Sequence, residues 1–131
     1  MKIRANNIDI EVEDSGPGTP GPARPVVLLI MGLGMQLVAW PPEMVKALEA
    51  AGYRVVRFDN RDVGLSQKFD GIIPDNAANA KAIAEGRAPN VPYTLNDMAD
   101  DVAALTPARM NHVGARPGSR LGRSILGLPQ E

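Results

Sequence analysis

The sequence contains no cysteine among its 131 residues. This absence excludes a disulfide framework and any metal site that depends on thiolate ligands. A chain without cysteine fits a reducing compartment, so we expect a cytoplasmic protein. Only one histidine is present, so the His and Cys spacings typical of metal sites are missing as well. We expect neither a metal nor another cofactor.

An excess of charge of either sign is also missing, with 14 basic and 15 acidic residues and a formal net charge of -1. The sequence therefore has no electrostatic footprint for nucleic acid or an anionic membrane. The longest apolar run, from Val26 to Met35, is broken by Gly32 and Gly34 and falls short of the roughly 20 residues that span a bilayer. The start of the chain, residues 1–7, lacks the apolar segment of a secretory signal. We predict no nucleic-acid partner and no membrane association, and the sequence leaves the oligomeric state unknown.

The first pattern that is present is an alternation of apolar and acidic residues over 2–14. Ile8, Ile10 and Val12 fall on one face of a strand, and acidic side chains fall on the other. This pattern predicts a hairpin or meander strand at a sheet edge. Residues 15–22 are rich in glycine and proline, which favours an exposed loop.

A β-α-β unit follows this loop. Residues 26–30 are apolar on both faces, as in a central parallel strand that is covered by helices on either side. After a glycine-rich turn, apolar residues at helical spacing predict a helix from Pro41 or Pro42 to Ala51, with Gly52 as its stop. Residues 53–58 then predict a second parallel strand.

The second half of the chain is less regular. Residues 59–92 are rich in loop-forming residues, and only 77–86 have a helical composition. Thr94 and Asp97 resemble a capping box, and the apolar residues after them share one helical face, which predicts a helix over 95–105. From residue 106 to 131 the chain is rich in Arg, Pro and Gly without periodicity. We therefore divide it into a folded part, 1–105, and an atypical tail, 106–131, that we do not expect to pack.

The glycine-rich turn between strand and helix allows more than one interpretation. In a dinucleotide site, such glycines let a pyrophosphate approach the helix N-terminus, and an acid such as Asp59 holds the ribose. Here the third glycine of that motif is absent, and the proline-marked helix start lies several residues beyond the turn. A second interpretation is purely structural, with Gly32 and Gly34 relieving crowding at a tight strand exit.

A third interpretation comes from a family resemblance. Four blocks occur in the order found in the α/β-hydrolase family: 28–34 (LLIMGLG), 40–41 (WP), 52–66 (GYRVVRFDNRDVGLS) and 93–102 (YTLNDMADDV). Together they resemble the branch of small esterases and lactonases that includes 3-oxoadipate enol-lactonase and the anthracycline methylesterases. The resemblance covers roughly residues 5–105. It implies an α/β fold in which opening antiparallel strands precede a parallel β-α-β unit, as the incomplete N-terminal portion of an α/β-hydrolase sheet.

The resemblance also implies where an oxyanion would bind. Met31, Gly32 and Leu33 stand where family members carry His-Gly-x, and the backbone N–H of Leu33 would be one oxyanion donor. Because this donor belongs to the main chain, methionine in place of histidine does not remove it. The charged residues Asp59, Arg61 and Asp62 favour a solvated or ion-paired loop over a catalytic or metal site.

The nucleophile of the family is missing from the sequence. Members continue into Gly-x-Ser-x-Gly, whereas residues 112–118 read HVGARPG, with Arg116 at the serine position and a proline after it. A guanidinium stays charged and is no nucleophile. Neither Ser119 nor Ser124 has the flanking glycine pattern of Gly-x-Ser-x-Gly. His112 precedes the elbow, whereas the catalytic histidine of the family follows it, so no catalytic residue is assigned in this chain.

These observations lead to a functional hypothesis. The chain is by descent a hydrolase of carboxylic esters or lactones, cut off before a functional nucleophile and inactive alone, and a reading-frame shift near Leu105 explains the unusual tail. A longer form would take a small-molecule ester or lactone. The alternatives are a non-catalytic remnant that serves as an interaction module and, third, a dinucleotide-binding β-α-β domain.

Overall fold

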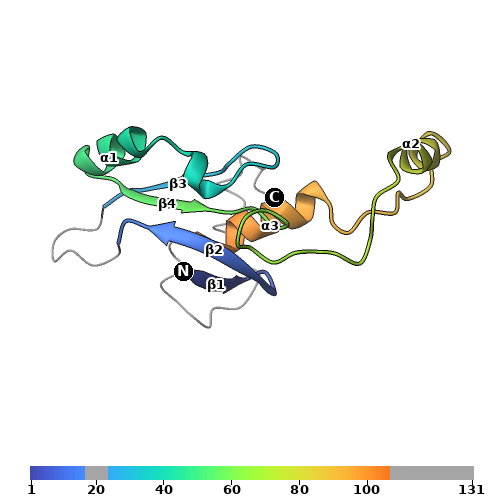
Figure 1. Cartoon of the computed structure of the whole chain (residues 1–131), viewed down its shortest axis with the longest axis horizontal. Helices are drawn as coiled ribbons and strands as arrows, with labels where there is room; N and C mark the ends of the chain where they lie inside the picture. Colours follow the sequence, from blue (N-terminus) through green and yellow to red (C-terminus); the bar gives the residue numbers. More distant parts are fainter. Residues whose placement is uncertain (17–23, 107–131) are drawn as a thin grey trace, which may run out of the picture.

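The computed structural model describes residues 1–16 and 24–106 of the chain. They form a four-stranded mixed sheet with the strand order β1-β2-β4-β3, together with three α-helices and one 3₁₀ turn (Figure 1). In chain order the elements are β1 (Lys2–Ala5), β2 (Ile8–Asp14), β3 (Val26–Leu29), η1 (Leu37–Ala39), α1 (Pro42–Ala50), β4 (Arg54–Phe58), α2 (Asn76–Ala84) and α3 (Leu95–Ala104).

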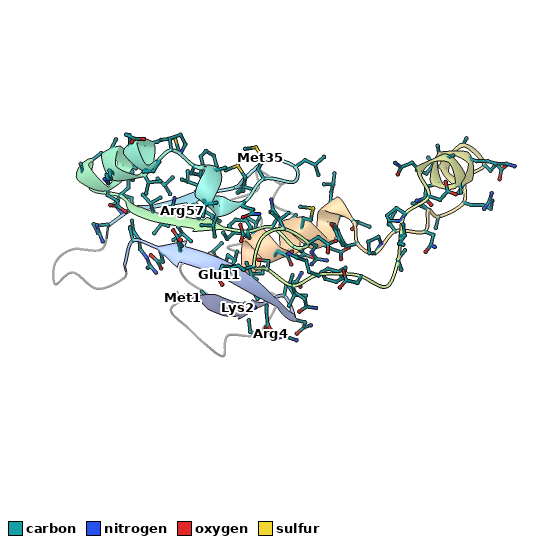
Figure 2. The ribbon with its side chains drawn as sticks, in the orientation of Figure 1. Met1, Lys2, Arg4, Glu11, Met35 and Arg57 are labelled. Carbon is teal, nitrogen blue, oxygen red and sulfur yellow. The ribbon has the colours of Figure 1, made fainter. Side chains whose placement is uncertain are left out.

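Strands β1 and β2 form the expected hairpin at one edge of the sheet. Asn6 and Asn7 connect them with φ values of 48° and 62°, the two positive values that a type I′ turn requires and that asparagine tolerates. Ile8, Ile10 and Val12 are buried while their neighbours are more exposed, so the predicted alternation is confirmed. The N-terminal ammonium donates to Glu11 Oε1 at 2.8 Å, which fastens the start of the chain to β2 (Figure 2).

The β-α-β unit is present, but one expectation about it is wrong. β3 and β4 are parallel, and β4 also pairs antiparallel with β2. β4 is therefore an inner strand, as β2 is, whereas within the described residues β3 pairs with β4 alone and lies at the sheet edge. The apolar run of residues 26–30 suggested a central strand covered on both faces. Instead β3 ends at Leu29, and Ile30 is 48% exposed.

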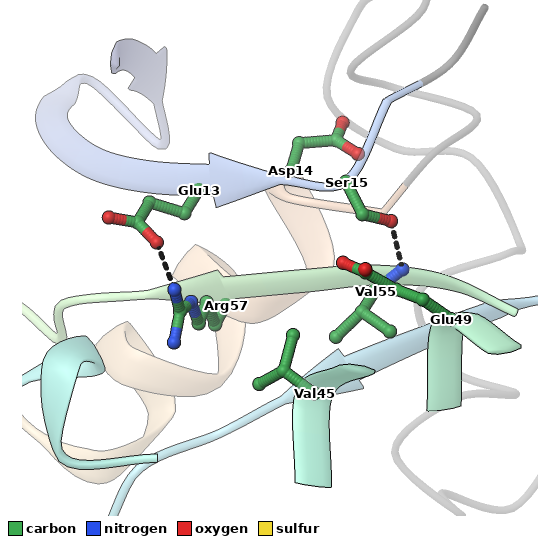
Figure 3. Close-up of a pocket in the computed structure, with 7 residues that line it drawn as sticks. All are labelled: Glu13, Asp14, Ser15, Val45, Glu49, Val55 and Arg57. Carbon is green, nitrogen blue, oxygen red and sulfur yellow. Dashed lines mark hydrogen bonds and ion pairs between the residues drawn. The ribbon is translucent and has the colours of Figure 1, made fainter. Parts of the chain in front are cut away.

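The helices α1 and α3 pack on opposite faces of β4, as the period of two along a strand dictates. On one face, Val56 and Phe58 join Val12 of β2, Val102 of α3 and the following Leu105 in the main core. On the other face, Val55 faces α1 (Figure 3). The prediction of α1 from its proline start is confirmed. Its packing is shallow, however, and none of its residues is fully buried.

The helix that the composition of residues 77–86 predicted is present as α2, shifted towards the N-terminus by one or two residues. Asp75 caps it by accepting a hydrogen bond from the Ala78 N–H at 3.0 Å. α2 projects away from the sheet on two extended segments, and only Ala82 is buried (Figure 1). By contrast, α3 lies against the sheet and begins with the predicted capping box between Thr94 and Asp97.

Candidate functional site

The loop between β3 and η1, residues 30–36, lies at the carboxyl end of a parallel strand, where ligands of open α/β sheets bind. It contains a tight turn in which Met35 N donates to Gly32 O at 3.3 Å. Gly34, the third residue of the turn, has a φ of +73°, close to the value that type II turns require and that glycine adopts without strain. Met35 marks the loop in Figure 2.

Leu33 occupies the outermost position of this turn. Its relative exposure is 102%, so neither its side chain nor its backbone is covered by another described residue. Within residues 1–16 and 24–106, no acceptor is found for the Leu33 N–H, and the hydrogen bond of the turn runs from the Met35 N–H to the Gly32 carbonyl. An oxyanion donor must be an N–H group that a ligand oxygen can reach, and an exposed backbone N–H at a strand end meets this requirement.

The ends of the loop are held by two residues that follow β4 directly. Asp59 is buried and accepts from the Leu37 N–H at 2.7 Å through Oδ1 and from the Leu65 N–H at 3.0 Å through Oδ2. Asn60, also buried, donates from Nδ2 to the Met31 carbonyl at 3.0 Å. Sequence reasoning missed both roles. The sequence signal for these roles was the placement of an acid and an amide, Asp59 and Asn60, immediately after a buried strand.

Ser66 attaches this arrangement to the sheet. Its Oγ donates to the Asp59 carbonyl at 2.6 Å and accepts from the Glu11 N–H at 2.9 Å, and the side chain is buried. The hydroxyl is thus fully used and inaccessible, which is incompatible with a role as a nucleophile. Gly64, with a φ of +51°, brings the backbone close to the Asp59 carboxylate.

A second buried charge joins the loop after β4 to α3. Arg61 donates from Nε and Nη2 to the two carboxylate oxygens of Asp101, each at 2.7 Å, and both side chains are almost fully buried. The Arg61 guanidinium also lies 5.1 Å from the ring centroids of Phe69 and Tyr93, within range of cation–π attraction. Asn6 of the β1–β2 turn donates to Asp101 Oδ1 at 2.8 Å.

These contacts explain the shifts of two titratable groups. The hydrogen bonds that Arg61 donates to Asp101 raise the pKa of Arg61, and burial raises the pKa of Tyr93, with a further contribution from a hydrogen bond to Asp62. Asp62 itself accepts from the Phe69 N–H at 2.7 Å. The charged residues of this loop are therefore committed to internal partners, in agreement with the expectation of an ion-paired corner.

A cavity of about 200 Å³ lies between α1 and the start of β4, on the face opposite α3 (Figure 3). Except for Glu49, its polar side chains have partners among the described residues. Glu13 pairs with Arg57, Asp14 pairs with Arg54, and Ser15 Oγ accepts from the Val55 N–H at 2.8 Å. This cavity lies at the opposite end of the strands from the Leu33 turn and offers no activated nucleophile.

The remaining predicted site residues cannot be placed. Arg116, His112, Ser119 and Ser124 all lie outside the described residues. In residues 1–16 and 24–106, no three His, Asp or Glu side chains are grouped as metal ligands would be. No helix in the same ranges is long and apolar enough to cross a membrane.

The dinucleotide interpretation does not fit this geometry. α1 begins at Pro42, and η1 separates it from the glycine turn, so the turn does not open into a helix N-terminus as a pyrophosphate site requires. Both carboxylate oxygens of Asp59 accept internal N–H groups, and the residue is only 3% exposed. It is therefore not presented to a ribose.

Comparison with known proteins gives a consistent result. Rhodomycin D methylesterase DauP of Streptomyces sp. (strain C5) is 31% identical over 108 residues, which is 82% of this chain and 30% of the relative. The Mycobacterium tuberculosis protein BpoC, which carries the name of a non-heme bromoperoxidase, is 36% identical over 130 residues, covering 95% of this chain and 38% of BpoC. No protein-family profile matches the chain.

Solved structures agree with these relatives. The enol-lactonase from Burkholderia xenovorans LB400 superposes on 80% of this chain and 31% of its own chain, with a TM-score of 0.53 and 26% identity. The chain thus spans about a third of the length of the relatives it matches. These similarities point to the α/β-hydrolase fold family, and the described residues match the N-terminal part of that fold.

Proposed function

We propose that this chain belongs to a hydrolase of carboxylic esters or lactones, and that it carries the oxyanion side of the active site without the nucleophile. The observation that carries the proposal is the exposed Leu33 turn at the carboxyl end of β3, whose N–H donates to no described residue. The names of two similar proteins, a methylesterase and an enol-lactonase, support this substrate class.

The chemistry of acyl transfer explains why such a donor matters. When a nucleophile attacks an ester carbonyl, negative charge develops on the carbonyl oxygen, and fixed N–H groups about 2.7–3.1 Å away stabilise it. In this proposal the Leu33 N–H supplies one such hydrogen bond. This N–H belongs to the main chain, on a turn in which Gly34 has a φ of +73°.

The nucleophile has no counterpart in the proposed site. Ser15 and Ser66 are the serines of the described residues, and both hydroxyls are engaged with backbone groups. Arg116 stands at the nucleophile position of the family pattern, and a guanidinium forms no acyl-enzyme. The 131-residue chain is therefore expected to bind or orient part of an ester at most, without turning it over.

The tail is part of the same proposal. The atypical tail, residues 106–131, includes a segment produced by a shift of reading frame, and a longer product of the repaired gene takes a small-molecule ester or lactone. The match to BpoC covers 95% of the chain and so extends beyond residue 106. The position of the shift is thus to be sought anywhere from codon 105 onwards. A cytoplasmic location completes the proposal and rests on the absence of cysteine.

The test has two parts. The coding DNA is sequenced through and beyond codon 105 and translated in three frames, and hydrolysis of a p-nitrophenyl ester is measured for the 131-residue chain and for any longer product. We expect a second frame with Gly-x-Ser-x-Gly followed by an acid and a histidine, an active longer product and an inactive short chain. If no frame supplies these residues, or if the longer product is inactive, the proposal is wrong and a non-catalytic interaction module becomes the better explanation.

A further inference from the structure

The Leu33 turn itself contains little that would hold it in place. Residues 32–36 are all exposed, and the hydrogen bond that closes the turn, at 3.3 Å, is long. The position of the Leu33 N–H must therefore depend on how the two ends of the loop, Met31 and Leu37, are fastened to the rest of the fold.

Both ends are fastened by adjacent residues of one segment. Asn60 Nδ2 donates to the Met31 carbonyl at the start of the loop, and Asp59 Oδ1 accepts from the Leu37 N–H at its end. The two bonds have opposite polarity, because the amide side chain can donate and the carboxylate can only accept. Exchanging these two residues would leave the Met31 carbonyl without a donor, because an aspartate at position 60 can only accept.

The contact at Leu37 also compensates for a missing helix cap. Leu37 is the first residue of η1, and Gln36, at the capping position, makes no hydrogen bond with its side chain. The N–H groups at the start of a helical turn lack internal partners and attract negative charge. Asp59 supplies that charge from a neighbouring strand end, and so fixes where η1 begins.

The clamp formed by Asp59 and Asn60 is in turn bonded to the sheet. Ser66 Oγ donates a hydrogen bond to the Asp59 carbonyl at 2.6 Å and accepts one from the Glu11 N–H on β2. The Leu65 N–H binds the second carboxylate oxygen of Asp59. The loop ends are thus tied through two residues to the inner part of the fold.

From these contacts we infer that Asp59 and Asn60 are positioning residues that set the location of the Leu33 N–H for an oxyanion. The inference rests on the proposed function of the loop and adds which residues hold it. Neither side chain is expected to contact substrate, since both are buried, 3% and 7% exposed, and bonded internally.

The first experiment uses the 131-residue chain and measures backbone amide exchange. Asn60→Ala removes the bond to Met31, and the hydrogen-bonded amides of Met35 and Leu37 should exchange roughly five- to tenfold faster, the effect of losing one hydrogen bond. Amides of β2 and α3 should be unchanged. Asn79→Ala is the matched control, because Asn79 Nδ2 also donates to a backbone carbonyl, that of Asn90 at 3.1 Å, far along the chain from the loop.

Two further variants keep the test decisive. Asn60→Leu preserves the side-chain volume and replaces Asn60→Ala if that variant does not fold, while Asp59→Asn weakens the other end of the loop. Unchanged exchange of the Met35 and Leu37 amides in the Asn60 and Asp59 variants would overturn the inference. An equal acceleration in Asn79→Ala would overturn it too, since the effect would then not be local.

The second experiment separates positioning from mere stability and uses the longer, active product. Asn60→Ala should lower kcat about 10- to 100-fold, as for a slightly misplaced donor, with KM nearly unchanged. If the unmodified product hydrolyses no ester, the proposed function fails, and amide exchange alone decides whether the clamp exists. If the unmodified product is active and Asn60→Ala retains its kcat, the function stands and the positioning role is overturned.

Discussion

A Cβ atom at Gly64 would lie 2.1 Å from Oδ2 of Asp59, closer than two such atoms can approach. The Asp59 carboxylate can therefore accept from the Leu37 and Leu65 N–H groups only because residue 64 has no side chain. The left-handed φ of +51° at Gly64 adds a second reason for glycine.

The first prediction follows from this contact. Gly64→Ala should lower the free energy of unfolding by about 3 kcal/mol, combining about 1 kcal/mol of backbone strain with the loss of buried hydrogen bonds to Asp59. Gly86→Ala is the matched control, because Gly86 has a φ of +71° but no atom within 4 Å of an added Cβ. Urea denaturation followed by circular dichroism measures both. Equal losses in the two variants would contradict the role assigned to Asp59.

The second prediction concerns the buried ion pair between Arg61 and Asp101. Asp101→Asn leaves a buried guanidinium without its counter-charge and should cost about 3–5 kcal/mol of stability. Asp9→Asn breaks the exposed pair with Arg4, in which the side chains are 64% and 52% exposed, and should cost less than about 1 kcal/mol. The free energies of unfolding of both variants test the difference, and comparable values would show that burial does not govern these pairs.

The third prediction concerns acid stability. Hydrogen bonds from Arg54 hold the pKa of the Asp14 carboxyl below its ordinary value, against an opposing effect of burial. A lowered folded-state pKa stabilises the fold at pH values above the ordinary carboxyl pKa of about 3.9, and this contribution disappears as pH falls through the folded-state value. The stability gap between wild type and Asp14→Asn should therefore be constant from about pH 5 to 7 and shrink below about pH 4. A gap that is the same at pH 3 and pH 6 would rule out this linkage.

The fourth prediction concerns the start of α3. The Thr94 Oγ1 accepts from the Asp97 N–H at 3.3 Å, and Asp97 Oδ2 accepts from the Thr94 N–H at 2.6 Å. Thr94→Ala should lower stability by about 1 kcal/mol, whereas Thr94→Ser, which retains the capping oxygen, should lower it much less. Thermal denaturation ranks the three proteins. If serine and alanine are equally destabilising, the cap does not contribute through its hydroxyl.

Local patterns were sufficient for much of the fold. The alternation around Ile10, the proline start of α1 and the capping box at Thr94 depend on neighbours in sequence, and each predicted its element. The apolar run at residues 26–30 wrongly predicted that β3 lies at the centre of the sheet. Within the described residues, this apolar strand lies at the sheet edge. Which strand pairs with β4 is a matter of tertiary structure that no local pattern contains.

The site was less predictable for the same reason. Leu33 was reached only through family resemblance, since a glycine-rich turn alone fits several functions. The roles of Asp59 and Asn60 depend on backbone groups more than 20 residues away, and Asp101 looks like any acidic residue on a helix until Arg61 is placed beside it. Hydrogen bonds from side chains to distant backbone leave no periodic trace in sequence.

The strand order β1-β2-β4-β3 has a consequence for synthesis on the ribosome. The β1–β2 hairpin emerges first, but its inner partner β4 is complete only at Phe58, and Val102 and Leu105, which cover the shared apolar face, come later still. At about 5–20 residues per second, Ile10 and Val12 stay uncovered for several seconds of translation. The nascent hairpin is thus a natural binding target for cotranslational chaperones until α3 has left the exit tunnel.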